Sequence, residues 1–107
     1  MSNYIYIISN GEAFKVGFSK DPKRRVKQLQ TGNPKKLELM YFVEIEVAPV
    51  KILEDIVHRY LKFNHLTGEW FKADFEKIKT ELDFVKIRYD NEDTARDFAL
   101  GILDYNA

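Results

Sequence analysis

The chain has 107 residues, 45% of them hydrophobic and 14% aromatic, and its 17 basic and 17 acidic residues give a formal net charge of zero. This length suits one domain and this composition excludes a disordered, collagen-like or linker-rich chain, while the lack of cysteine excludes disulfides, a cysteine nucleophile and a thiolate zinc site. No apolar run approaches the roughly 20 residues of a membrane helix and no signal-peptide pattern opens the chain, so we expect a soluble cytoplasmic protein without membrane contact.

Two short segments near the N-terminus are predicted to form a β-hairpin. Residues 3–9 and 13–19 are rich in aromatic and β-branched residues, which favour strands. The dipeptide Asn10-Gly11 between them is typical of a hairpin turn. The first two strands are therefore expected to be antiparallel.

The rest of the chain predicts one further strand and several helices. Asp21 can cap a helix that has Pro22 in its first turn, where the missing N–H costs nothing. The expected segments are a helix over 22–30, a strand over 37–47, a helix over 49–63, a loop over 64–68, a short extended or irregular stretch over 69–72, a helix from Asp74 to about Tyr89, and a last helix from Asn91 or Asp93 to about Asp104. This order predicts an α+β fold, with a small three-stranded sheet that begins in an antiparallel hairpin and is flanked by helices, plus C-terminal helices.

Charge is unevenly distributed along the chain. Residues 1–40 hold eight Lys and Arg residues against three acidic residues, a balance of +5, and residues 41–107 hold nine against fourteen, a balance of −5. The basic residues of the first part are Lys15, Lys20, Lys23, Arg24, Arg25, Lys27, Lys35 and Lys36. This asymmetry points to an anionic partner for the N-terminal half. A solvated surface whose charges balance locally is the alternative.

Alternation along the hairpin places particular side chains on one face. Tyr4, Tyr6 and Ile8 share one face of the first strand, and Lys15 and Gly17 share one face of the second. One face of the hairpin could therefore bring Tyr6 near Lys15 and a glycine. The alternative is an ordinary strand tyrosine and an ordinary half-exposed lysine.

Helical periodicity separates the two arginines of the first helix. Val26 and Leu29 lie in the inward stripe, Arg25 lies at its edge, and Arg24 lies on the far side. An arginine whose stem packs on the core suits phosphate binding. A salt-bridge role fits the same pattern.

Glu54 and His58 are neighbours, four residues apart, at one edge of the apolar face of the second helix. A carboxylate at a core boundary is costly unless a cation lies nearby, and a metal ion or Arg25 would supply one. A Glu–His pair in contact with water is the alternative. Together with Tyr6 and Lys15, these groups suit hydrolysis of a phosphodiester: the carboxylate holds a divalent metal, the arginine neutralises phosphate charge, and the tyrosine or lysine handles a proton.

Five segments, in this order, resemble the motifs of the GIY-YIG nuclease superfamily. They are Tyr4-Ile5-Tyr6 in place of Gly-Ile-Tyr, Lys15-Val16-Gly17 in place of Tyr-Ile-Gly, the arginine segment 21–34, the glutamate segment 53–58, and Gly68-Glu69-Trp70-Phe71. The pattern is similar to the subgroup of phage proteins and meiotically up-regulated-gene proteins, in which a Lys-Ile-Gly form and a Glu-Trp-Phe ending are usual. The resemblance covers about residues 3–73. It predicts a nuclease core over 1–73 and a helical extension of the same domain over 74–107.

The resemblance implies a divalent-metal-dependent endonuclease that cleaves DNA with Mg²⁺ or Mn²⁺. It makes Tyr6 the general base or the group that orients the attacking water, and it places Lys15 where the second family tyrosine stands. It makes Arg25 the ligand of the scissile phosphate, Glu54 the metal ligand, and His58 a proton donor or a positioning group. Lys15 is the larger departure from the family pattern, because it would lower the pKa of Tyr6, bind phosphate itself, or mark a weakened active site.

Other residues near these motifs have simpler interpretations. Trp70 and Phe71 are expected to fill the core beside the second helix, with stacking on an unpaired base as the alternative. Glu69 is expected to be a cap or a salt-bridge partner rather than a metal ligand. The basic residues expected to follow the DNA backbone, without sequence preference, are Lys20, Lys23, Arg24, Lys35 and Lys36.

Three functions stay open at this point. The first is the endonuclease, the second is a nucleic-acid-binding module on the same fold that cleaves poorly or not at all, and the third is a protein-interaction domain. The C-terminal segment is acidic, with Asp90, Glu92, Asp93, Asp97 and Asp104 against Arg96. It would repel DNA and suits contact with a second copy or a partner protein, or a lid over the sheet.

Overall fold

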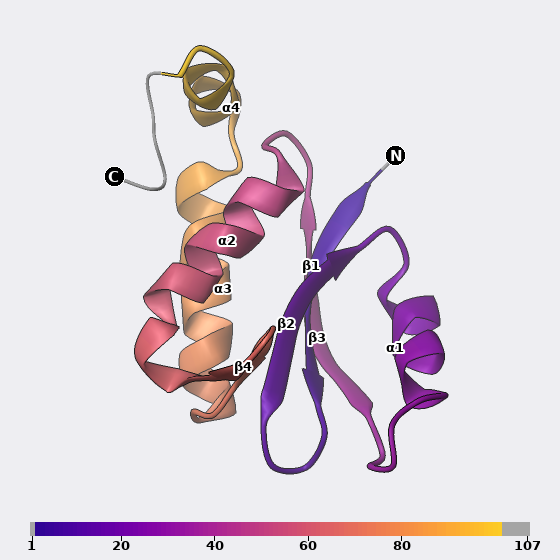
Figure 1. Ribbon diagram of the computed structural model, residues 1–107. Helices are drawn as coiled ribbons and strands as arrows, with labels where there is room; N and C mark the ends of the chain where they lie inside the picture. The colour runs from indigo at the N-terminus through magenta and orange to yellow at the C-terminus, as the bar shows by residue number, and fades with distance from the viewer. Residues whose placement is uncertain (1, 102–107) are drawn as a thin grey trace.

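The structure is a computed structural model that describes residues 2–101. Its elements in chain order are β1 (Asn3–Ser9), β2 (Phe14–Ser19), α1 (Pro22–Gln30), β3 (Glu38–Ile45), α2 (Val50–Tyr60), the 3-10 turn η1 (Lys62–Asn64), β4 (His65–Thr67), β5 (Trp70–Phe71), α3 (Phe75–Tyr89) and α4 (Glu92–Ala99). Figure 1 shows α1 on one side of the sheet and α2 with α3 on the other. The predicted α+β class is confirmed. Within residues 2–101, no helix is both long and apolar enough to cross a membrane.

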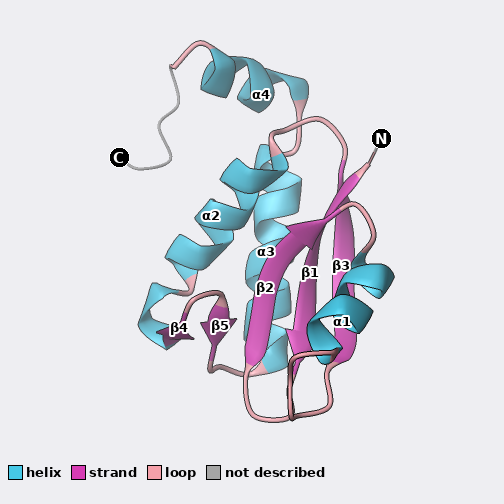
Figure 2. Ribbon diagram, turned by 45° about the vertical axis from the view of Figure 1, so that its right-hand side comes forward, coloured by secondary structure: helices cyan, strands magenta, loops and turns pink. Residues whose placement is uncertain are grey.

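The sheet has five strands in the order β3-β1-β2-β5-β4, and each neighbouring pair is antiparallel. The predicted number of three strands was therefore wrong: β4 lies in the stretch expected to be a loop, and β5 in the stretch expected to be extended or irregular. These strands span only three and two residues, too few for alternation to reveal them. Strand β5 forms because it pairs with Phe14 and Lys15 of β2, and β4 pairs in turn with β5, beside which it lies in Figure 2.

The two faces of the hairpin supply two separate hydrophobic clusters, as alternation predicted. Ile5, Ile7 and Val16 belong to the larger cluster, which α2 and α3 cover. Tyr6 and Ile8 belong to the smaller cluster beneath α1. Helix α3 contributes three fully buried side chains to the larger cluster: Ile78, Leu82 and Val85. This helix therefore shares the hydrophobic core of the sheet.

Polar side chains at the N-caps define where two of the helices begin. Asp21 Oδ1 accepts a hydrogen bond of 3.1 Å from the backbone N–H of Arg24, and Pro22 stands in the first turn of α1, as predicted. Asn91 caps α4 in the same way, by accepting from the backbone N–H of Thr94 at 2.8 Å. Asp74 stands at the N-cap of α3, but its side chain makes no capping hydrogen bond.

Helices α2 and α4 are shorter than predicted. The chain leaves α2 after Tyr60 and tightens into η1, so Phe63, which was expected inside the helix, is 91% exposed. Tyr60, the last residue of α2, is exposed as well. Helix α4 is followed by Gly101, whose φ of +74° is typical of a residue that ends a helix. The predicted helix end at Asp104 lies outside the described residues.

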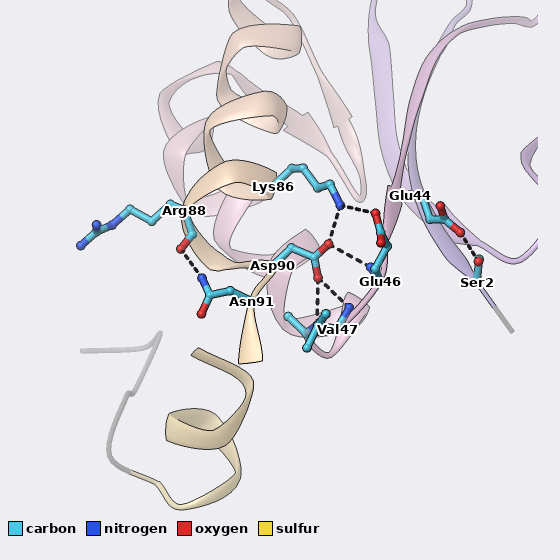
Figure 3. A network of polar contacts seen from close by, with 9 residues as sticks. Ser2, Glu44, Glu46, Val47, Lys86, Arg88, Asp90 and Asn91 are labelled. Carbon is cyan, nitrogen blue, oxygen red and sulfur yellow. Dashed lines mark hydrogen bonds and ion pairs between the residues drawn. The ribbon is translucent and has the colours of Figure 1, made fainter. Parts of the chain in front are cut away.

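Asp90, directly after α3, ties this helix to the loop that follows β3 (Figure 3). Its Oδ1 accepts hydrogen bonds from the backbone N–H groups of Val47 and Ala48, and its Oδ2 accepts from that of Glu46 and forms an ion pair with Lys86. The side chain is 1% exposed. Burial by itself raises the pKa of Asp90, but these hydrogen bonds outweigh it and hold the pKa below its ordinary value.

Replacing Asp90 with Asn should lower the free energy of unfolding by about 2–3 kcal/mol at neutral pH, because hydrogen bonds to a charged group are the stronger kind. Since the folded-state pKa lies below the unfolded one, this stabilisation is present above the unfolded pKa and is lost as pH falls through the folded pKa. Urea unfolding of both proteins over a pH series measures the difference, which should shrink in acid. Asp93→Asn, at a side chain that is 85% exposed, is the matched control. An equal loss for both variants would contradict the assignment.

Candidate active site

Tyr6 and Gly17 lie directly opposite one another at the centre of the β1–β2 pair. A Cβ atom added to Gly17 would stand 2.5 Å from the Tyr6 hydroxyl oxygen and 3.1 Å from Glu69 Oε1. Contacts this short cannot form without movement, so the missing side chain of Gly17 leaves the space that the phenol occupies. Tyr6 is 1% exposed. The predicted meeting of Tyr6 with a glycine of the second strand is confirmed.

Arg25 approaches the Tyr6 phenol from α1. Burial, and then the negative charge of Glu69, raise the pKa of Tyr6, while Arg25 opposes them through its charge and a hydrogen bond. The upward effects dominate, so the phenol is neutral near pH 7. The lowering influence comes from Arg25, and the alternatives for Lys15 stay open. Helical periodicity favoured Arg25 over Arg24, and Arg25 is the arginine that reaches Tyr6.

Lys15 is held by Glu69. The Lys15 Nζ lies 3.1 Å from Glu69 Oε1, and the Lys15 side chain is 17% exposed. The backbone of Glu69 is fixed as well, because its carbonyl accepts a hydrogen bond of 3.0 Å from the backbone N–H of Val16. The expectation that Glu69 is a salt-bridge partner is confirmed. Its partner could not be named from the sequence, because β5 had not been identified as a strand.

Glu54 presents a buried carboxylate on α2. Its side chain is 1% exposed, and Oε1 accepts a hydrogen bond of 3.2 Å from Lys51 Nζ. In the part of the chain that the structure describes, Oε2 is buried without a hydrogen-bond partner. Burial, followed by the charge of Glu69, raises the pKa of Glu54 to about 7, although Lys51 acts in the opposite direction. Such a carboxylate is costly unless it gains a proton or a cation.

His58 contacts β2 beyond the last residue that pairs with β5. Strand β5 pairs with β2 only at Phe14 and Lys15, and beyond them His58 Nε2 lies 2.8 Å from the carbonyl oxygen of Val16. Because a carbonyl only accepts, the proton lies on Nε2. Burial lowers the pKa of His58, so the ring is neutral near pH 7. The imidazole therefore anchors α2, the helix of Glu54, to the edge of the sheet.

Glu69 links the predicted residues into one group. It pairs with Lys15, and its charge raises the pKa of Tyr6 and of Glu54. The structure thus brings Tyr6, Lys15, Arg25 and Glu54 together. From the sequence, Glu69 was expected to be only a cap or a salt-bridge partner. Its position in the segment Gly68-Glu69-Trp70-Phe71 was the signal that it belongs to the site.

The donor set suits a divalent cation that keeps much of its water. Within residues 2–101, no three His, Asp or Glu side chains gather as a ready-made metal cluster. Mg²⁺ is commonly bound through one or two carboxylates while it keeps several waters. Among the described residues, Oε2 of Glu54 has no hydrogen-bond partner, so it is the oxygen that such an ion could bind; the Glu69 charge lies close enough to raise the Glu54 pKa.

The basic residues expected along a DNA backbone form two groups at the two ends of α1. They are Lys20, Lys23 and Arg24 at its start, and Lys35 and Lys36 after its end, and all five are exposed. Arg24 and Arg25 line a hollow of about 360 Å³ at one end. Lys35 lines a hollow of about 400 Å³ at the other, together with Trp70. Exposed cations thus stand at both ends of the helix that carries Arg25.

Phe71 and Trp70 point to opposite faces of the sheet. Phe71 is 1% exposed and packs in the larger cluster, where its ring contacts His58. Trp70 is half-buried and packs on the other side, in the smaller cluster beneath α1. The expectation that both fill the core beside the second helix is therefore wrong for Trp70, because successive strand residues alternate between faces.

A family comparison covers all of these residues. The model of the T5orf172 domain matches residues 3–86. The chain belongs to the T5orf172 domain family. T5orf172 domains are often associated with phage proteins and with GIY-YIG-like or HNH-like nuclease modules, which agrees with a nucleic-acid-related role. The match extends into α3, beyond the stretch that the motif resemblance covers. Comparison with curated proteins and with solved structures gives no significant match.

Gly17→Ala should destabilise this T5orf172 domain by about 1–3 kcal/mol, because the added methyl group forces the buried Tyr6 phenol to move. Gly32→Ala is the matched control, since a Cβ there would meet nothing within 4 Å. Denaturant unfolding of the two variants measures the difference. Equal stabilities would show that Tyr6 has room to shift at little cost.

Glu54 should make the metal-free domain less stable as pH rises. Its folded-state pKa of about 7 lies above the ordinary value of 4.5 for a glutamate. Its stabilising contribution is therefore present below about 4.5 and is lost as pH rises through about 7. Glu54→Gln should therefore be more stable than the wild type at pH 8, on the order of 2 kcal/mol, and similar to it in acid. Urea unfolding in EDTA across this range tests the difference, with the exposed Glu76→Gln as control. Parallel stability curves would refute the assigned pKa.

Proposed function

We propose that this chain is a divalent-metal-dependent endonuclease that hydrolyses phosphodiester bonds of DNA in the manner of GIY-YIG nucleases. The observation that carries the proposal is the buried Glu54 carboxylate, one oxygen of which has no hydrogen-bond partner within residues 2–101. This carboxylate lies within electrostatic reach of Tyr6 and Glu69. A buried carboxylate without a compensating partner lowers the stability of the folded protein, and binding of a cation would offset that cost. Membership of the T5orf172 family supports a nucleic-acid-related role.

Glu54 is the residue that would hold Mg²⁺ or Mn²⁺, with water completing the coordination. The bound ion supplies Lewis-acid stabilisation of the charge on the phosphate and lowers the pKa of a bound water. His58 is a positioning residue in this scheme, because its bond to the Val16 carbonyl holds the helix that presents Glu54. Its neutral ring carries the proton on the nitrogen that faces the strand, which argues against a proton donor.

Arg25 is the candidate ligand of the scissile phosphate, since a guanidinium binds two phosphate oxygens at once and spreads their charge. Tyr6 lies under it as a neutral phenol, which suits orientation of the attacking water better than abstraction of its proton. In the reaction, the water oxygen bonds to phosphorus, the ester P–O bond breaks, the water gives up a proton and the departing oxygen takes one. Lys15 contributes a second positive charge, although Glu69 shares it.

The Lys15–Glu69 ion pair favours a second candidate function, a nucleic-acid-binding module without efficient cleavage. The Lys15 ammonium is already paired within the protein, so it offers less to a phosphate than an unpaired lysine would. A module of this kind would bind DNA through the basic residues at the two ends of α1 and would need no metal. The two functions differ in one observable, the dependence of strand breakage on Glu54.

Supercoiled plasmid incubated with Mn²⁺ or Mg²⁺ should be nicked by the wild type, and Glu54→Gln should reduce the rate at least about 100-fold, because the metal supplies several kcal/mol to the transition state. Arg25→Ala should reduce the rate by about the same factor. Arg88→Ala, at an exposed arginine of α3 on the other side of the sheet from α1, is the matched control and should change the rate little. Gel separation of supercoiled and nicked plasmid gives the rates.

Three results would change the assignment. Equal nicking by the wild type and Glu54→Gln would indicate contamination or a wrong site. Salt-sensitive DNA binding without nicking by any protein would favour the binding module. A melting temperature that Mn²⁺ raises equally in the wild type and Glu54→Gln would place the ion elsewhere.

A further inference from the structure

A hollow of about 400 Å³ lies beside the candidate active site, near the turn of the β1–β2 hairpin. Three segments that are distant in sequence form its walls: the hairpin turn, the loop after α1, and the β4–β5 region. The residues that matter here are Asn10, Asn33, Lys35, Leu66, Trp70 and Lys72. Its volume lies within the range of roughly 300–1,000 Å³ that is usual for sites of small organic groups.

Trp70 gives this hollow an aromatic wall that the core holds in place. Part of the indole packs in the cluster with Tyr6 and Ile8, and the residue also lines the hollow. In the sheet Trp70 is paired with Lys15, whose Nζ lies 5.8 Å from the centre of the indole ring. The aromatic wall is therefore next to the lysine of the candidate active site. Leu66, which is 52% exposed, adds a second apolar surface.

The polar rim suits a nucleotide. Lys35, Lys72 and Glu12 line the hollow. Lys35 Nζ forms an ion pair of 2.6 Å with Glu12 Oε2, and the charge of Lys72 also lowers the Glu12 pKa, so the three charges lie together and Lys72 leaves a net positive charge. Asn10 and Asn33 use their Oδ1 atoms to accept backbone hydrogen bonds from neighbouring residues. This leaves their Nδ2 groups as donors, and ring nitrogens and carbonyl oxygens of a base can accept from such groups.

We propose that this Trp70 hollow receives one unpaired base of a DNA strand whose backbone crosses the candidate active site. The base stacks on the indole, and Lys35 and Lys72 contact the flanking phosphates. This inference rests on the proposed nucleic-acid function but not on cleavage. A base inside a duplex is stacked and paired, so it cannot enter the hollow without being extruded. The protein therefore prefers single-stranded or frayed DNA to an intact duplex.

The chain contains a single tryptophan and six tyrosines, so fluorescence excited at a wavelength that only tryptophan absorbs reports on this hollow. A single-stranded oligonucleotide titrated in EDTA, where cleavage cannot occur, should quench the emission to a saturating level. An abasic strand of the same length and phosphate number should bind at least about tenfold more weakly and should not quench, since stacking on an aromatic side chain contributes about this much per base. The matched duplex should also bind more weakly than the single strand.

Single substitutions separate the contribution of base stacking to DNA affinity from the contribution of charge. Trp70→Leu should lose about tenfold in affinity for the ordinary strand, measured by anisotropy of a labelled oligonucleotide, and should bind the abasic strand as the wild type does. Trp70→Phe should retain most of the affinity. Lys35→Ala should weaken both strands by the same factor. Circular dichroism checks that each variant folds, and if Trp70→Leu does not, the comparison of the two strands on the wild type decides.

The outcomes distinguish this proposal from the endonuclease. Equal affinity for ordinary and abasic strands, without quenching, overturns the base site even if the plasmid is nicked. Base-dependent binding with quenching supports it even if no plasmid is nicked, and in that case only the proposed cleavage fails. A duplex that binds as tightly as the single strand, with equal quenching, also overturns the base site.

Discussion

The close approach of the Tyr6 phenol to the backbone of Gly17 is the constraint around which the candidate site is arranged. The antiparallel register puts these two residues opposite one another, and the space left by the glycine lets the phenol lie against β2. Arg25 then reaches the hydroxyl from α1, and Glu69 comes close to it from the segment before β5. A side chain at position 17 would displace the phenol and with it the meeting point of three elements that are distant in sequence.

The negative charges of the candidate site are not fully compensated by positive groups of the described residues. The Glu69 carboxylate is shared with Lys15, whereas the Glu54 carboxylate keeps one buried oxygen without a partner among the described residues. Burial and the neighbouring negative charge raise the pKa of Glu54 to about 7, so near neutral pH the group is poised between carrying a proton and carrying a charge. A divalent cation would resolve this conflict by replacing the proton, which ties metal binding directly to the stability of the fold.

The two faces of the sheet have different roles. The face covered by α2 and α3 holds the larger core and provides most of the buried apolar surface. The face beneath α1 holds the smaller cluster, the Tyr6 group and the Trp70 hollow, with exposed cations at both ends of the helix. Glu54 belongs to α2, the helix whose His58 binds the Val16 carbonyl of β2 beyond the residues that pair with β5.

The sequence by itself determined the local features of this protein: the hairpin, the capped α1, the separation of Tyr6 from Ile5 and Ile7, and the choice of Arg25 over Arg24. Alternation and helical periodicity suffice for these, because both depend on residues a few positions apart. Only the tertiary structure decided that β4 and β5 exist, that Lys15 pairs with Glu69, and that Trp70 faces away from α2. Strand β5, the ion pair and the side on which Trp70 lies depend on pairing between segments more than 50 residues apart (Lys15 to Glu69). A strand of two residues carries no period of its own, so the strand edge that β5 pairs with sets its position, and β4 then pairs with β5.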